Sequence, residues 1–271
     1  MASNTQELFL VLRPSKFGYS NSMAALILYS TVISYDIKYV LADLPQGFEA
    51  ILKRYEEARE ALSAAVRYGL LFYSESIMRA CEPMISCLSK LIKRGVKVVC
   101  YLNLADLERE RELAVEVSRL VLRASVKKLD DYEIREWLRI LSEYSTECKK
   151  TADSLLEILS VTDASRMAVL TGLEGFQLVE ILKKRGLEVK VRAAGLPYVR
   201  SPLEVMVLKY ERGELSVDEL KCLVNDYVDY IKNYVVRYET LEEAHIAWSC
   251  KKAPWLKSLF QHEIVGNNIC S

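Results

Sequence analysis

Residues that could bind a small charged ligand follow several short apolar runs of this sequence. Arginine and lysine side chains hold phosphate or carboxylate groups through charge-assisted hydrogen bonds, and hydroxyl and carboxylate groups orient such ligands. The candidate ligand-binding residues are Arg13, Ser15, Lys16, Asp43, Glu75, Thr171, Glu174, Arg192 and Arg200. Their arrangement favours a binding or regulatory module for a small anionic ligand. The alternative for the basic members is ordinary solvated surface charge.

Three of these residues are acidic and open a second possibility. Asp43, Glu75 and Glu174 could converge, either to bind a divalent metal through oxygen ligands or to share a proton for acid–base work. The commoner role of an acidic residue at a strand–helix turn is to cap the helix that follows. A carboxylate-based, metal-dependent hydrolase is therefore the alternative to the binding module.

Other catalytic and cofactor motifs have little support. The two histidines, His245 and His262, both lie near the C-terminus, which leaves little for a zinc site or a histidine-based triad. The seven cysteines are scattered without a Cys-x-x-Cys pair, as is typical of small buried side chains. Residues 171–175 contain two glycines but match neither GxGxxG nor GxxxxGK[ST]. The sequence therefore specifies no cofactor.

The elements that must position these residues follow from the pattern of apolar runs. Short runs that are apolar on both faces alternate with longer helical patterns, as in strands covered by helices on both sides. The predicted strands are Leu8–Leu12, Ile37–Leu41, Leu70–Tyr73, Val96–Tyr101, Met167–Leu170 and Leu187–Val191. This alternation predicts an α/β fold with a central, mostly parallel sheet. In such sheets ligands bind beyond the carboxyl ends of the strands, where the candidate residues occur.

Two long segments depart from this alternation. Residues 104–159 contain no glycine, no proline and no predicted strand, which indicates a helical insertion over about 104–160. From residue 201 onward the pattern is again helical, beginning with Ser201 as N-cap and Pro202 as first helical residue. We therefore expect an α/β domain over residues 1–200, with the insertion, and a helical C-terminal extension over 201–271 packed on it.

Composition narrows the class of protein further. The chain has 37 basic residues (Lys and Arg) and 37 acidic residues (Asp and Glu), so its net charge argues against binding to nucleic acid. The apolar stretches are too short to span a bilayer and the N-terminus lacks the features of a signal peptide, which predicts a cytoplasmic protein without a membrane partner. Abundant charged residues and scarce glutamine hint at a thermophilic source.

The C-terminal helices suggest a third functional hypothesis. They are rich in apolar residues, and Trp248 and Trp255 lie near their end. Such a segment could pack on the body of the protein, form a homo-oligomer or bind a protein partner. The chain would then be a structural subunit of a larger assembly.

Three short motifs have the layout of a known family. They are Lys38–Pro45, Arg94–Val99 and Val169–Gly172, with the helical insertion between the last two. Over about residues 7–195 this layout resembles the TraB/PrgY and erythromycin-esterase-like superfamily. The resemblance implies the same α/β architecture with hydrolytic or metal-dependent chemistry at the strand ends.

The sequence departs from that family where its chemistry resides. Only Asp43 keeps the acidic character of the family's glutamate. Residues 13–16 and 172–175 stand where the family has histidine-containing elements. The resemblance therefore implies a divergent, non-hydrolytic member.

Overall fold

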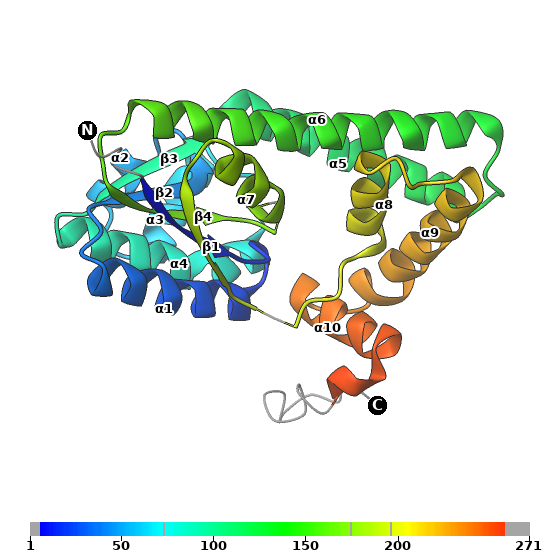
Figure 1. The fold of residues 1–271 in the computed structure, drawn as a ribbon. Helices are drawn as coiled ribbons and strands as arrows, with labels where there is room; N and C mark the ends of the chain where they lie inside the picture. Colours follow the sequence, from blue (N-terminus) through cyan, green and yellow to red (C-terminus); the bar gives the residue numbers. More distant parts are fainter. Residues whose placement is uncertain (1–5, 73, 174, 196, 258–271) are drawn as a thin grey trace. The chain divides into compact units, whose positions relative to one another are not determined.

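The computed structural model describes residues 6–72, 74–173, 175–195 and 197–257, and it contains a five-stranded, all-parallel sheet (Figure 1). The strands are β1 (Glu7–Leu12), β2 (Tyr39–Pro45), β3 (Lys97–Leu102), β4 (Arg166–Thr171) and β5 (Glu188–Ala193). Their order across the sheet is β3-β2-β4-β1-β5. The predicted α/β class is thus confirmed.

Helices connect the strands, and three more helices follow β5 in the described chain. They are α1 (Gly18–Ser34), α2 (Phe48–Arg54), α3 (Ala58–Arg67), α4 (Glu75–Lys93), α5 (Leu104–Ala124), α6 (Asp131–Val161), α7 (Gly175–Lys184), α8 (Pro202–Glu211), α9 (Val217–Tyr230) and α10 (Leu241–Lys252). A π-helical turn, η1 (Ile231–Val235), continues α9, and a 3₁₀ turn, η2 (Pro254–Leu256), follows α10. None of the helices in these ranges combines the length and apolar character that crossing a bilayer requires.

Successive strand residues point to opposite faces of the sheet, and their side chains pack into two apolar cores, one on each face. Phe9 and Val11 of β1 belong to the core covered by α1, α2, α3 and α4. Leu8 and Leu10 belong to the opposite core, which α6 and α7 cover. This alternation is the two-residue period of a strand, and it explains why the sheet's runs are apolar on both faces.

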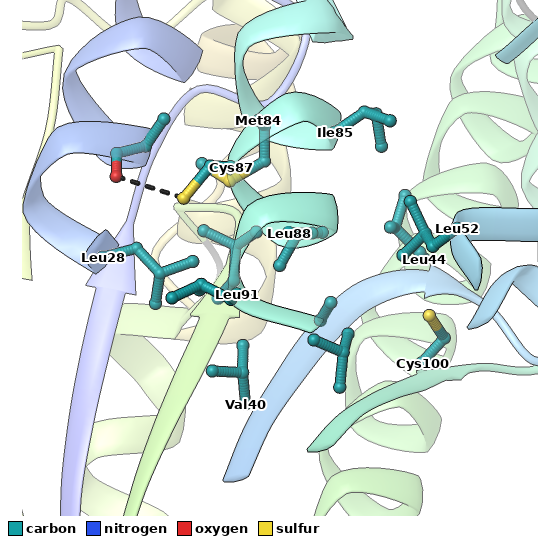
Figure 2. Close-up of a cluster of buried hydrophobic side chains, with 14 of the residues drawn as sticks. Leu28, Val40, Leu44, Leu52, Met84, Ile85, Cys87, Leu88, Leu91 and Cys100 are labelled. Atoms are coloured by element: carbon teal, nitrogen blue, oxygen red, sulfur yellow. Dashed lines mark hydrogen bonds between the residues drawn. The ribbon is translucent and has the colours of Figure 1, made fainter. Parts of the chain in front are cut away.

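Figure 2 shows the first of these cores between α1, α4 and the sheet. Leu28 of α1 and Leu88 of α4 are both fully buried there with Val40 of β2. The Cys87 thiol donates a hydrogen bond to the carbonyl oxygen of Ala25 at 3.3 Å, and burial raises the pKa of that thiol to about 11. Cys87 therefore behaves as a small buried side chain, as its isolated position in the sequence indicates.

The predicted strand at Leu70–Tyr73 is wrong over its described part. Leu70 to Phe72 pair with no strand; instead the N–H groups of Gly69 and Leu70 donate to the carbonyl oxygens of Val66 and Ala65 and close the end of α3. Gly69 has a φ of 72°, the left-handed conformation with which such helix ends terminate. Tyr73 lies outside the described residues. Within this run Leu71 is buried in the core next to the helix end, whereas Phe72 is exposed.

The chain divides into two compact units, and the division differs from the predicted one. The first unit comprises residues 1–107 and 148–196 and contains the sheet; the second comprises 108–147 and 197–271. The apolar core of the second unit joins residues of α5 and α6 to residues of α8 and α9. Its members are Val117, Leu120, Val121, Ile134, Trp137, Ile140, Leu141, Met206, Leu220 and Val224. The middle of the helical insertion therefore shares a core with the C-terminal helices rather than with the sheet.

Candidate functional site

Strands β1 and β4 are neighbours in the sheet, and the chain leaves them toward opposite faces. After β1 it enters α1, which buries Leu28 in one core and leads to β2. After β4 it enters α7, which buries Leu178 in the other core and leads to β5. Divergence of two connections at adjacent strand ends marks the position at which open α/β sheets bind ligands. We refer to this position as the switch point.

Arg13 is the residue that follows β1, and it is buried at the switch point. Its Nη1 and Nη2 donate to Oδ2 and Oδ1 of Asp43, at 2.9 and 3.0 Å, and its Nε donates to Oδ1 of Asn21 at 2.6 Å. Its backbone N–H donates to the carbonyl oxygen of Thr171 at 3.2 Å. Arg13 thus ties the ends of β1, β2 and β4 to the first turn of α1.

The Arg13–Asp43 pair lies almost entirely out of contact with water. The two side chains are 5% and 9% exposed. Burial raises the pKa of the Asp43 carboxyl, and the charge and hydrogen bonds of Arg13 oppose that rise. Burial acts to lower the pKa of Arg13, but the Asp43 carboxylate outweighs it and the pKa of the guanidinium is raised. The two-point contact is the strongest geometry for such a pair, and it neutralises the charge of Arg13 within the protein.

The loop between β1 and α1 is held by Asn21 from within the helix. Asn21 Nδ2 donates to the carbonyl oxygens of Ser15 and Phe17, at 2.8 and 3.0 Å. The Cys81 thiol of α4 also donates to the Ser15 carbonyl, at 3.9 Å. Ser15 is half-buried, whereas the Lys16 side chain beside it is exposed. The loop therefore presents a lysine to solvent from a backbone fixed by a buried amide.

The loop after β4 begins with a buried hydroxyl group. Thr171 is fully buried, and within the described part of the chain its Oγ1 has no hydrogen-bond partner. Gly175 opens α7 so close to it that a Cβ at this position would collide with Thr171 Cγ2 and Leu12 Cδ2. Only glycine lets α7 start this near the ends of β4 and β1. Glu174, one of the predicted site residues, lies outside the described residues.

Two helix N-termini meet this edge of the sheet. Neither α1 nor α7, as the structure describes them, has an acidic residue in its first turn. Phe17, the N-cap residue of α1, makes no side-chain capping hydrogen bond. Helix N-termini carry partial positive charge and point backbone N–H groups outward, which favours anions. The two helix N-termini therefore favour an anion at this edge, although the charge of Arg13 is neutralised.

The remaining predicted site residues that the structure describes belong to other elements. Glu75 begins α4, is exposed, and accepts hydrogen bonds from Arg59 and Arg79, at 2.7 and 3.3 Å. Arg192 is an exposed residue of the edge strand β5 itself, because that strand extends to Ala193. Arg200 belongs to the second unit. The structure thus brings together Arg13, Asp43 and Thr171, with Ser15 and Lys16 in the adjoining loop.

Two of the three predicted carboxylates, Asp43 and Glu75, are described, and each binds arginine side chains. Asp43 faces Arg13, and Glu75 faces two arginines of its own surroundings. Among the described residues, no group of three His, Cys, Asp or Glu side chains is placed to hold a metal ion. The geometry therefore offers no specific support for the metal-dependent hydrolase.

Sequence reasoning missed two residues that shape the switch point. Tyr101 of β3 is fully buried and donates a hydrogen bond to the carbonyl oxygen of Leu170 in β4, at 3.1 Å. Asn21 lies inside α1, where its Oδ1 accepts a hydrogen bond from Arg13. The available signal was a single amide in a helix without charged residues, since a buried polar group requires a partner.

Comparison of the chain with known proteins found no match. No family model matches the chain, and neither a curated protein nor a solved structure matches it. Function is therefore inferred from the geometry of the site, because a fold class alone does not specify one.

The second unit contains a separate group of buried polar side chains around His245. The ring of Tyr198 stacks on the imidazole with centroids 4.8 Å apart, and the Tyr230 hydroxyl lies 3.3 Å from Nδ1. The Tyr198 hydroxyl donates to both carboxylate oxygens of Glu204, at 3.0 and 2.9 Å. Trp248 is buried beside His245, with ring centroids 5.6 Å apart. Trp248 is therefore core, whereas Trp255 is exposed.

Stability of the second unit is expected to fall as pH is lowered from about 6.5 to about 4. Burial lowers the pKa of His245 from 6.5 to about 4, against the smaller opposing effect of a hydrogen bond with the backbone of Val199. The folded-state pKa is below the unfolded one, so neutral His245 contributes full stability above pH 6.5, and this is lost toward pH 4. The loss is about 3 kcal/mol, since one pKa unit corresponds to about 1.4 kcal/mol. Urea denaturation followed by tryptophan fluorescence measures it.

The variant His245→Gln provides the comparison for that titration. It removes the ionisable ring and leaves every other acid-titrating group in place, so the difference between the two proteins isolates His245. A difference in unfolding free energy that is constant from pH 4.5 to pH 7 would contradict the expectation.

Proposed function

We propose that this chain is a binding or regulatory module that holds a small anionic ligand at the switch point, between the loops that follow β1 and β4. The observation that carries the proposal is the divergence of α1 and α7 from adjacent strands, with both helix N-termini at the same edge. Two further features support it. Lys16 is exposed in the first loop, and Thr171 provides an unpaired hydroxyl at the end of β4, within the described residues.

The side chains of the first unit that could take part in catalysis favour a binding function over an enzymatic one. The first unit has no histidine in its sequence. Its buried carboxylate, Asp43, is occupied by Arg13, and burial raises the pKa of the Cys81 thiol to about 11. A thiol with so high a pKa is a poor nucleophile at neutral pH. The same arrangement fits the resemblance to the TraB/PrgY superfamily as a non-hydrolytic relationship, because Asp43 faces an arginine.

The ligand is identified by a thermal-shift screen of the purified chain, followed by calorimetry on any hit. The panel contains inorganic phosphate, nucleotides, sugar phosphates, acyl-CoA esters and divalent metal ions. A ligand that binds only the folded state at about 100 times its Kd stabilises by roughly 2.7 kcal/mol, which is a clear shift in Tm. We expect at least one phosphate compound to produce it.

Two variants and one matched control locate the binding. Lys16→Ala is expected to raise the Kd of the phosphate compound about tenfold, because it removes a charged hydrogen bond to the ligand. Thr171→Val should also weaken it, while leaving stability nearly unchanged, because it removes an unpaired buried hydroxyl. Lys38→Ala is the control, since Lys38 is an exposed lysine that precedes β2 at the opposite edge of the sheet. Equal weakening by both lysine variants, or stabilisation by metal ions alone, would overturn the proposal.

A further inference from the structure

Helix α1 has no charged side chain along its 17 residues. Its inner side is buried against the sheet and α4 through residues such as Ala24, Leu28 and Val32. A helix that covers a sheet normally shows a polar, charged face to water. α4, which packs beside α1, follows that rule with the exposed residues Glu75 and Lys90. The outer side of α1 has no charged residue and so departs from this rule.

The outer side of α1 is an apolar stripe with a regular spacing. Tyr19, Met23, Leu26 and Ile33 are all exposed large apolar residues, and Leu26 is 68% exposed. Together with the exposed Ser30 they are separated by four, three, four and three positions. This is the seam spacing with which one helix packs along another. None of the stripe's residues belongs to the core described for the first unit.

We propose that the stripe of α1 is an interface with a second copy of this chain. An occupant that carried charges onto an uncharged helix would lose their hydration without gaining a counter-charge. The occupant must therefore present an uncharged apolar helix of its own, and α1 is such a helix. A twofold axis near Leu26 sets the two helices antiparallel, so that Tyr19 lies near Ile33 of the partner subunit. This orientation also places opposite helix-dipole ends together.

The size of the stripe sets the expected strength of the dimer. Its exposed apolar surface is on the order of 300–400 Å² per copy, or roughly 600–800 Å² for the pair, which is below the roughly 1,200 Å² of stable specific interfaces and fits a weak, transient contact. We therefore expect a reversible dimer with a Kd of about 1–100 µM. This inference does not depend on the ligand proposed for the switch point.

Sedimentation velocity of the full chain between about 1 and 300 µM tests the dimer, since that range brackets the expected Kd. Wild type should pass from monomer to dimer within it, and Leu26→Lys should raise the Kd at least tenfold. Leu122→Lys is the matched control, because Leu122 lies on α5 and is 67% exposed, almost the same as Leu26. A wild-type protein that stays monomeric, or equal effects of the two lysine variants, would overturn the proposal.

A cross-linking variant tests the geometry independently of stability. A residue on a twofold axis meets its own copy, so Leu26→Cys should form a disulfide with the same position of a second chain under mild oxidation. Leu122→Cys, treated identically, should not, and peptide mapping separates either product from pairing of the native cysteines. A dimer that forms without the Leu26→Cys cross-link would overturn the antiparallel arrangement.

Discussion

Replacing Asp43 by alanine is expected to lower the free energy of unfolding of the first unit by about 3–5 kcal/mol. The substitution leaves the Arg13 guanidinium buried, 5% exposed, without the carboxylate that accepts two of its hydrogen bonds. An unpaired charge in such a place costs far more than the pair contributes when intact. Urea denaturation followed by circular dichroism measures the loss, and hydrogen exchange of β1 and β2 locates it.

Two further variants separate this mechanism from general damage. Lys93 and Glu56 form an ion pair whose side chains are 60% and 84% exposed, so Glu56→Ala should cost no more than about 1 kcal/mol. The double variant Arg13→Met with Asp43→Leu removes both charges and should recover most of the lost stability. A double variant as unstable as Asp43→Ala would show that the pair's charge is not the cause.

Replacing Trp137 by alanine is expected to destabilise the second unit by about 3–5 kcal/mol. Trp137 is fully buried in the core that joins α5 and α6 to α8 and α9, and its ring meets that of Tyr227 edge-on at 6.4 Å. The substitution removes the largest fully buried side chain of the described chain and leaves a cavity that helices cannot fill by small shifts. Fluorescence reports the transition, because the chain's other two tryptophans, Trp248 and Trp255, also lie in this unit.

The exposed tryptophan supplies the control for this prediction. Trp255 is 63% exposed, so Trp255→Ala should change the unfolding free energy by no more than about 0.5 kcal/mol. If Trp137→Ala shifted the hydrogen exchange of the sheet as much as that of α8 and α9, the division into two cores would not hold. Equal effects of the two tryptophan variants would contradict the role assigned to Trp137.

The sequence by itself determined the fold class and the main helical segments, because both are local patterns. Short apolar runs correspond to all five strands, although β5 alternates apolar with charged residues, and the helical pattern that starts at residue 104 corresponds to the two long helices α5 and α6. The same signal failed at Leu70–Tyr73, where the described residues close a helix. A short apolar run reports burial but does not distinguish a buried strand from a buried helix end.

Only the tertiary structure decided what the strand-end residues do. Arg13 and Asp43 are 30 positions apart, and their pairing depends on the order β2-β4-β1, which places both strand ends at one site. Nothing in the local sequence distinguishes an arginine that faces a ligand from one that faces a buried carboxylate. The sharing of a core between residues 108–147 and the C-terminal helices is decided in the same way. Strand order, side-chain partners and core membership are contacts between distant segments, so they are set when those segments pack and not by the residues of any one of them.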